Sequence, residues 1–376
     1  MNFLLRALRS AVSGKQPVPL RRDDVRSVIV VELMRLGDVL VIIPSLHLLR
    51  SSFPSATLHL FLDEHHASLI ESLDIDIVVH EVPNSQSLRA MFGILEKINI
   101  LKGDIALSMS PSKRNAFAVL SSRAKVIGGY LEGGGTPAPF LYRWKIEMFG
   151  TTMPTNVYAN ENIYLRPWKV CETLGLSDGL SFIRSSMRPV PRESAEEELR
   201  AMKILPKTSF IILHPFSAWE FRSWPLQDFV ELARSILVQT SHDVLFLCHV
   251  DESDQMSAPR ETFRFNKRVH FFASRDLIHT AVLMSNAEAF VGNDSGPLHL
   301  AAALGIKHVG LFGPADPRLT APPTAHGVHC YKKVECSPCD QRQCIRPDDS
   351  CMELISVDDV ARPLLEMLVK DPVVDV

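Results

Sequence analysis

The sequence lacks the features that would place the protein inside a membrane or on nucleic acid. It has no run of about 18 apolar residues, whereas a helix needs about 20 to span a bilayer. The formal net charge of the 376 residues is only −3, so the overall charge gives no argument for nucleic acid. An anionic partner must therefore be held by a local site.

A secretory signal is also missing. Residues 1–15, MNFLLRALRSAVSGK, are interrupted by Arg6 and Arg9, which breaks the apolar segment that such a signal needs. Drawn as a helix, this stretch has an apolar face and a basic face, a pattern that can rest on an anionic membrane surface. The alternative is a frayed tail. We expect a cytoplasmic protein with a basic amphipathic tail at 1–25, and peripheral contact with the inner membrane stays open.

The sequence contains only one Cys-x2-Cys pair, whereas a four-cysteine zinc site normally has two. Four of the seven cysteines lie close together in the order Cys336, Cys339, Cys344 and Cys351. Their spacing does not match a known iron–sulfur cysteine motif. Disulfides are not the first expectation for a protein without an export signal. We expect reduced structural thiols, with a bound metal or a disulfide as alternatives.

What the sequence does contain is a regular alternation of apolar, strand-like runs with helical stretches. Hydrophobic residues make up 46% and charged residues 22%, as in ordinary soluble proteins, and the length suggests about two domains. The alternation predicts an α/β protein with parallel sheets. The expected strands are 27–33, 57–62, 75–82, 104–109, 124–129, 209–216, 243–250, 269–274, 287–294 and 308–313, and the clearest helices are 45–52, 86–101 and 226–239.

The alternation weakens between about 130 and 190 and then resumes, which indicates a domain boundary. We therefore expect one domain over 26–195, a second over 196–355, and a C-terminal helix and tail over 356–376. Two α/β halves imply a cleft between them. Ligands of parallel sheets collect beyond the carboxyl ends of the strands, so the strand-to-helix junctions are where the chemistry is expected.

The first such junction is MRLGDVLVIIPSL, residues 34–46. Gly37 permits a tight turn, and Asp38 stands at or near a helix start, where an aspartate commonly caps backbone N–H groups. A general base at the mouth of the cleft is the functional alternative. Pro44 makes the start of the helix uncertain and allows a longer loop.

The second junction is HPFSAWEFRSWPLQDF, residues 214–229. Pro225 suits the first position of a helix, and Arg222 lies in the loop just before it. The guanidinium of Arg222 could hold phosphate oxygens, or it could stack on Trp219 or Trp224 at the surface. The residues alone favour neither.

The third junction, GNDSGPLHL, follows the strand AEAFVG. Asp294 and Ser295 are natural helix caps, Gly296 permits close approach of a ligand, and Pro297 can start a helix. Free N–H groups at a helix N-terminus, with the positive end of the helix dipole, form an anion site. With His299 nearby, this break looks suited to a diphosphate.

Three blocks in this order resemble glycosyltransferase family 9, the lipopolysaccharide heptosyltransferases. They are RLGDVLVIIPSLHLLRSSFPSA, WEFRSWPLQDFVELA and GNDSGPLHLAAALGIKHVGLFGPADP, and the correspondence spans residues 27–360. The resemblance implies a GT-B fold, with two Rossmann-like domains facing across a cleft. It also implies an inverting transfer that needs no metal, from ADP-heptose to the lipid-linked inner core of lipopolysaccharide.

Residue by residue, the resemblance implies Asp38 as catalytic base, with Arg35 and Gly37 of the same block on the acceptor side. It implies donor binding by Asp294, Ser295, Gly296 and His299, with Arg222 where the family often has a lysine and Glu252 at the ribose. The cysteine run is similar to one in some family members. Another nucleotide sugar or acceptor, a nucleotide-sugar epimerase and a non-catalytic binding protein remain the alternatives.

Overall fold

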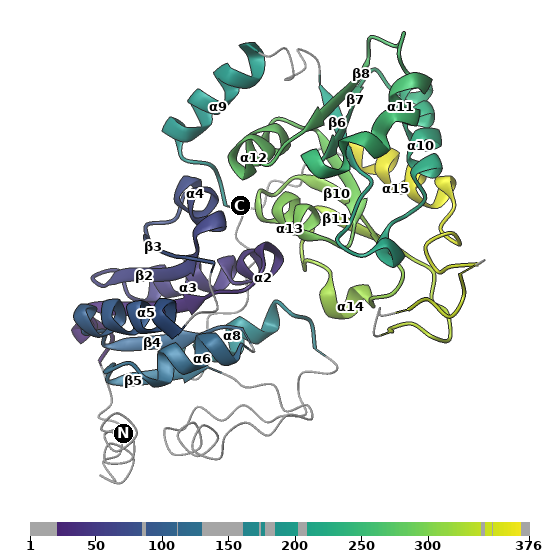
Figure 1. The fold of residues 1–376 in the computed structure, drawn as a ribbon. Coiled ribbons are helices and arrows are strands. Elements are labelled where there is room, and N and C mark those ends of the chain that lie inside the picture. Colours follow the sequence, from purple (N-terminus) through teal and green to yellow (C-terminus); the bar gives the residue numbers. More distant parts are fainter. Residues whose placement is uncertain are drawn as a thin grey trace. The chain divides into compact units, whose positions relative to one another are not determined.

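The computed structural model describes residues 21–84, 88–110, 112–129, 161–172, 174–176, 185–201, 209–339, 343–347 and 349–369. Most of the amphipathic N-terminal tail therefore lies outside the described residues. The chain forms two compact units, Met1–Glu71 with Ile75–Ile183 and Ser72–Asp74 with Arg184–Val376. Each unit contains one sheet (Figure 1), and the paired strands within each sheet run parallel.

The division between the units falls before the helix α9 (Pro189–Ala201), whereas the sequence placed it inside that helix, at 195/196. Helix α9 packs against α12 (Leu277–Ser285) of the second unit. Asn286, which ends α12, donates from Nδ2 to Oε1 of Glu196 at 3.2 Å. These contacts tie α9 to the second unit.

The first sheet has the order β3-β2-β1-β4-β5. Its strands are β1 (Ser27–Glu32), β2 (Thr57–Asp63), β3 (Val78–Val82), β4 (Ile105–Ser108) and β5 (Val126–Gly129). The helices of this part of the chain are η1 (Arg22–Asp24), α2 (Leu36–Val41), α3 (Ile43–Ser52), α4 (Glu64–Ser72), α5 (Leu88–Leu101), α6 (Lys113–Leu120) and α8 (Leu165–Glu172).

Strand β1 lies in the middle of this sheet because its side chains are apolar on both faces, as in parallel strands covered by helices on both sides. Ile29 and Val31 join Phe61 in one buried cluster. Helix α5 adds Ile94 and Ile98 to it, which are four residues apart and so share one helix face. The single charged residue of β1 stands at its end, where the functional junction begins.

The second sheet has the order β11-β10-β9-β6-β7-β8. Its strands are β6 (Phe210–His214), β7 (Asp243–Cys248), β8 (Val269–Ala273), β9 (Ala289–Asn293), β10 (Lys307–Phe312) and β11 (Gly327–Tyr331). Besides α9 and α12, the helices are η3 (Glu220–Arg222), α10 (Leu226–Gln239), η4 (Val250–Met256), α11 (Ser257–Thr262), α13 (Gly296–Ala303), α14 (Pro317–Thr320) and α15 (Val357–Val369).

In both sheets the strand order reverses beside the first strand. The chain proceeds from β1 to β2 and β3, then returns to place β4 on the other side of β1. In the same way it proceeds from β6 to β7 and β8, then places β9 on the other side of β6. Ligands of open α/β sheets bind outside the strand ends at such reversals. Both reversals coincide with junctions that the sequence singled out.

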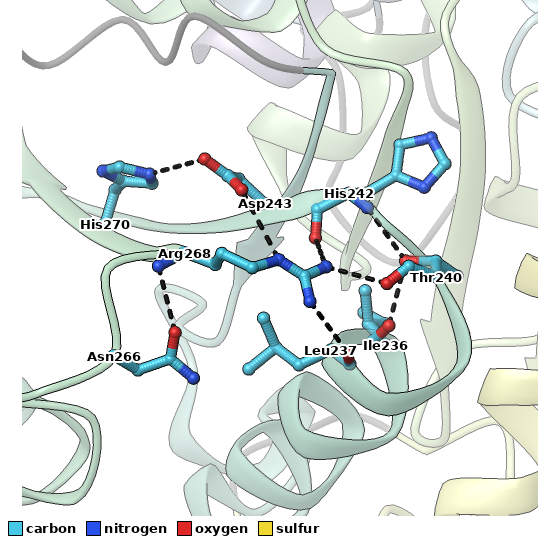
Figure 2. Close-up of polar contacts among 8 residues, drawn as sticks. All are labelled: Ile236, Leu237, Thr240, His242, Asp243, Asn266, Arg268 and His270. Carbon is cyan, nitrogen blue, oxygen red and sulfur yellow. Dashed lines mark hydrogen bonds and ion pairs between the residues drawn. The ribbon is translucent and has the colours of Figure 1, made fainter.

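A half-buried arginine, Arg268, closes the C-terminal end of α10 (Figure 2). The last carbonyls of a helix have no partner within the helix. Arg268 donates to the carbonyls of Leu237 at 2.9 Å, Thr240 at 2.8 Å and His242 at 2.5 Å, and its Nε lies 3.7 Å from Asp243 Oδ1. This cluster fixes the connection between α10 and β7 and so stabilises the second sheet.

The predicted α/β class and the ten predicted strands are confirmed, with ends that differ by up to three residues. Strand β11 and helix α8 were missed, since Gly327 and His329 interrupt the apolar pattern and α8 lies near the weak region 130–190. Pro225 is the N-cap of α10 rather than its first residue, and Pro44 lies in the first turn of α3, the second of two helices, instead of lengthening a loop. None of the described helices is long and apolar enough to cross a membrane.

Candidate functional site

The site in the second unit is organised by Asn293, the last residue of β9. Its side chain is fully buried, donates from Nδ2 to the carbonyl of Pro215 at 2.8 Å and accepts at Oδ1 from the N–H of Trp224 at 2.9 Å. Trp224 is itself held in the core, where its indole N–H donates to the carbonyl of Ile355 at 2.8 Å. One amide side chain therefore fixes both ends of the loop that carries Arg222.

That loop brings Arg222 to the end of β9. The Nη1 of Arg222 lies 3.6 Å from Oδ2 of Asp294 and donates to the backbone carbonyl of Asp294 at 3.4 Å. The backbone N–H of Asp294 donates to the carbonyl of Leu311 at 3.1 Å, which ties the turn to β10 as well. The carboxylate expected to cap a helix pairs with the arginine instead, because Arg222 offers it a charge that a backbone amide does not.

His299, on α13, lies on the other side of the same carboxylate. Its Nε2 is 3.9 Å from Oδ1 of Asp294, and burial lowers the pKa of His299 to about 4. His299 is therefore neutral near pH 7, and this contact is polar rather than an ion pair. Burial raises the pKa of Asp294, while the charges of Arg222 and His329 partly offset that effect. His329, on β11, was not found from the sequence because it lies in the strand that was missed.

The N-terminus of α13 has no side-chain cap. Ser295 is the N-cap residue, but its hydroxyl donates backward to the carbonyl of Asn293 at 3.2 Å rather than accepting from the first turn. Gly296 and Pro297 form the first two positions of the helix, as expected for a helix that presents its end to a ligand. The prediction that Asp294 and Ser295 cap this helix through their side chains is therefore wrong.

Glu252 follows β7, the neighbour of β6 in the sheet, so it lies at the same sheet edge as the ends of β6 and β9. Its Oε2 accepts from the backbone N–H of His249 at 2.8 Å within a capping box, and burial raises its pKa. The structure thus gives Glu252 a helix-capping contact. Its predicted role at a ribose stays a prediction.

In the first unit, Asp38 is the third residue of α2, and Arg35 is the N-cap. Burial raises the pKa of Asp38, and the backbone amide of Arg35 together with the charges of Arg35 and Arg166 partly offsets that effect. Gly37 lies between these residues in the first turn. The third position of a helix is where an acid can cap the N-terminus. Both the cap and the base therefore stay predictions for Asp38.

Behind Asp38, the structure shows a charged residue that the sequence reasoning missed. Glu32 is the last residue of β1 and is fully buried, and the charge of Asp38 helps to raise its pKa. The signal was available, since Glu32 is the only charged residue in the strand SVIVVE.

The four clustered cysteines line one pocket in the second unit, together with Phe221, which precedes Arg222, and Pro314, which follows β10. All are free thiols. The backbone N–H of Cys339 donates to the carbonyl of Pro314 at 3.0 Å, and a Cβ on Gly313 would lie 2.7 Å from Sγ of Cys351. A larger residue at this position would force the side chains of Met352 and Cys351 to shift. Among the described residues, no group of three or more Cys, His, Asp or Glu is arranged to hold a metal.

Comparisons with known proteins relate the chain to glycosyltransferases. Residues 181–348, which contain the junctions after β6 and β9, match the model of glycosyltransferase family 9 (heptosyltransferase). Lipopolysaccharide heptosyltransferase 2 of Escherichia coli (strain K12) is 31% identical over 115 residues, which are 30% of this chain and 33% of that protein. The chain thus matches about a third of the length of this curated relative.

Two solved structures extend the likeness to nearly the whole chain. The glycosyl transferase family 9 from Veillonella parvula DSM 2008 has a TM-score of 0.77 at 20% identity, covering 94% of this chain and 100% of that one. E. coli ADP-heptose lps heptosyltransferase II has a TM-score of 0.71 at 15% identity, covering 91% and 98%. These likenesses show the fold, which is GT-B with two parallel-sheet α/β domains.

Proposed function

Since the chain is a heptosyltransferase-like protein of glycosyltransferase family 9, we propose that it transfers a heptose from ADP-heptose to the inner core of lipopolysaccharide. The observation that carries this proposal is the junction at the end of β9. There Arg222 reaches Asp294 beside a helix N-terminus that has no side-chain cap. The names of the similar proteins supply the identity of the donor and the acceptor class.

In this proposal the diphosphate of the donor lies at the first turn of α13. Backbone N–H groups there, the hydroxyl of Ser295 and the guanidinium of Arg222 would bind its oxygens. Arginine is suited to this task because its donors match two phosphate oxygens at once. His299 is neutral and can donate one hydrogen bond without adding charge. Glu252 would accept from ribose hydroxyls through the carboxylate oxygen that His249 does not use.

The chemical step that we propose is one displacement at the anomeric carbon. Asp38 takes the proton from the acceptor hydroxyl as the oxygen forms its bond to that carbon, and the bond to the diphosphate oxygen breaks. ADP leaves with the electron pair. Arg222 and the α13 N–H groups offset the charge that develops on the leaving group, so the proposed step needs no metal. A single displacement gives the product the opposite anomeric configuration.

The acceptor in this proposal is a lipid-linked saccharide, which would bring the enzyme to the inner face of the cytoplasmic membrane. Arg35 and Gly37, beside Asp38, would contact the acceptor. Arg35 is the exposed N-cap of α2 and can pair with acidic groups.

Incubation of the purified protein with ADP-heptose, with and without a core saccharide acceptor, tests the proposal. We expect heptosylated acceptor of inverted configuration. Asp38→Asn should lower turnover by about 10²-fold or more, the scale of general-base assistance. The amide keeps much of the size and capping ability of aspartate, so the unfolding temperature should change little. The matched control is Asp76→Asn, an aspartate that is 91% exposed in the same unit.

Three outcomes would contradict parts of the proposal. A changed sugar without acceptor would indicate epimerisation, and tight donor binding with neither product would indicate a binding protein. Normal turnover in Asp38→Asn, accompanied by lower stability, would make Asp38 a helix cap only.

A further inference from the structure

Glu32 is a fully buried carboxyl at the reversal point of the first sheet. It is the last residue of β1, the strand that pairs with β4. Arg35 and Asp38 follow it closely in the sequence. A buried carboxyl needs hydrogen-bond partners, because its transfer from water costs several kcal/mol when it is left unpaired. The partners of Glu32 therefore show which parts of the chain its side chain holds together.

The partners come from the end of β4 and from α6. The hydroxyl of Ser110 makes a short contact with Oε2 of Glu32, and Nδ2 of Asn115 donates to Oε1 at 3.2 Å. Asn115 is fixed in turn, since its N–H donates to Oγ of Ser112 at 3.3 Å.

The same network holds the loop between β1 and α2. The N–H of Leu33 donates to Oδ1 of Asn115 at 3.0 Å, and the Met34 amide acts to lower the pKa of Glu32. The first residue of the three-residue loop 33–35 is therefore bound to a buried side chain that itself contacts Glu32. Because α2 begins directly after this loop, the network fixes where its third residue, Asp38, is placed.

The charges around Glu32 favour its neutral form. Burial and, to a lesser extent, the charge of Asp38 raise the pKa of Glu32 to about 8, although Ser110, Asn115 and the Met34 amide act in the opposite direction. Arg35 and Arg166 act on Asp38. Near pH 7 Glu32 is thus neutral and sets no second charge beside Asp38.

We propose that Glu32 is a positioning residue for the reaction at Asp38. As a neutral acid it anchors the loop 33–35 and keeps the negative charge of the pair on Asp38. When Glu32 ionises, the network loses the proton that Glu32 contributes. A second negative charge then repels the carboxylate of Asp38, and Asp38 leaves the position that the reaction needs. This inference rests on the proposed role of Asp38 as the base.

The kinetic test compares Glu32→Gln, which mimics the neutral acid, with Glu32→Ala. The glutamine variant should match the wild type at pH 7 and keep its kcat above pH 8, where the wild type declines. The alanine variant should lose about 10- to 100-fold in kcat, the cost of a small misplacement, with little change in donor KM. Glu81→Gln, an exposed glutamate on β3, should behave as the wild type. Equal decline of wild type and Glu32→Gln above pH 8 would overturn the proposal, as would normal kcat in Glu32→Ala.

A second measurement needs no substrate and so separates this inference from the proposed function. In carboxyl ¹³C NMR, Glu32 should titrate near pH 8, and Asp38 should show a small step at the same pH that is absent in Glu32→Gln. Titration of Glu32 near its ordinary 4.5, or an Asp38 signal with no step, would overturn the inference even if heptosyl transfer is shown. If the two signals behave as expected but no donor turns over, the proposed function fails instead.

The pH dependence of the free energy of unfolding also tests whether Glu32 is neutral, and the direction of the change can be predicted. The folded protein keeps the Glu32 proton between the unfolded value of 4.5 and about 8, so across that range the unfolded state binds fewer protons. The urea midpoint of the wild type should therefore fall relative to that of Glu32→Gln as pH rises through this window. A constant difference across the window would contradict a neutral Glu32.

Discussion

Arg222 and Asp294 lie 72 positions apart in the sequence, yet Nη1 of the arginine is 3.6 Å from Oδ2 of the aspartate. The pair joins the loop after β6 to the turn after β9, two strands that are neighbours only because the sheet order reverses between them. Asp294 is buried and Arg222 is partly exposed, so the arginine can still turn donors toward a ligand.

This pair predicts a split between binding and turnover. Arg222→Ala should lower kcat by about 10²-fold, because a fixed cation beside the leaving diphosphate stabilises charge that develops in the transition state. The effect on donor Kd should be smaller, and Arg222→Lys should restore part of the loss. Steady-state kinetics with calorimetric donor binding measure both. The matched control is Trp219→Ala in the same loop, and normal turnover in Arg222→Ala would refute the role.

Asn293 should be more important for stability than for donor contact. Asn293→Ala leaves the N–H of Trp224 and the carbonyl of Pro215 without their partner, at about 1–3 kcal/mol for each buried group. We expect the free energy of unfolding to drop by about 2–4 kcal/mol in chemical denaturation. Asn266→Ala removes one exposed side-chain contact and should cost less than about 1 kcal/mol. Equal losses in the two variants would argue against the bridging role.

The first turn of α13 should carry the donor diphosphate. Ser295→Ala and His299→Ala should each weaken donor binding by about tenfold, the loss of one hydrogen bond to a charged group at about 1.4 kcal/mol. Ser285→Ala, in α12, is a matched control that should bind normally. Calorimetry with ADP-heptose or ADP measures the affinities. Unchanged Kd in both site variants would move the donor away from this helix.

Treatment with a chelator tests two questions separately, namely whether turnover needs a metal and whether the cysteine pocket holds one. We expect EDTA to leave turnover unchanged, since Arg222 and helix N–H groups offset the diphosphate charge in the proposed step. Loss of activity that magnesium or manganese restores would contradict that mechanism. Folding in the presence of chelator is measured by calorimetry or circular dichroism. Loss of folded structure would instead assign a structural metal to the four thiols. In that case Cys344→Ser should lower the unfolding temperature as well.

Much of the second unit follows from local patterns. The helix α10 begins and ends where its apolar periodicity predicts, and β9 ends at the polar break that starts the third junction. These signals are local because helix ends and strand ends depend on neighbouring residues. The same reasoning failed for β11, where short length and polar residues hide a strand that only its pairing with β10 defines.

The sequence by itself determined the α/β class, ten of the strands in their order, and the three junctions that carry Asp38, Arg222 and Asp294. It could not determine that Asp294 pairs with Arg222 instead of capping α13, or that Asn293 holds the loop between them. Nor could it show that the glutamate at the end of β1 is buried against Ser110 and Asn115. Those facts depend on which strand ends meet at a sheet edge, and long-range packing decides that, since it controls both the burial of a charge and the partners within its reach.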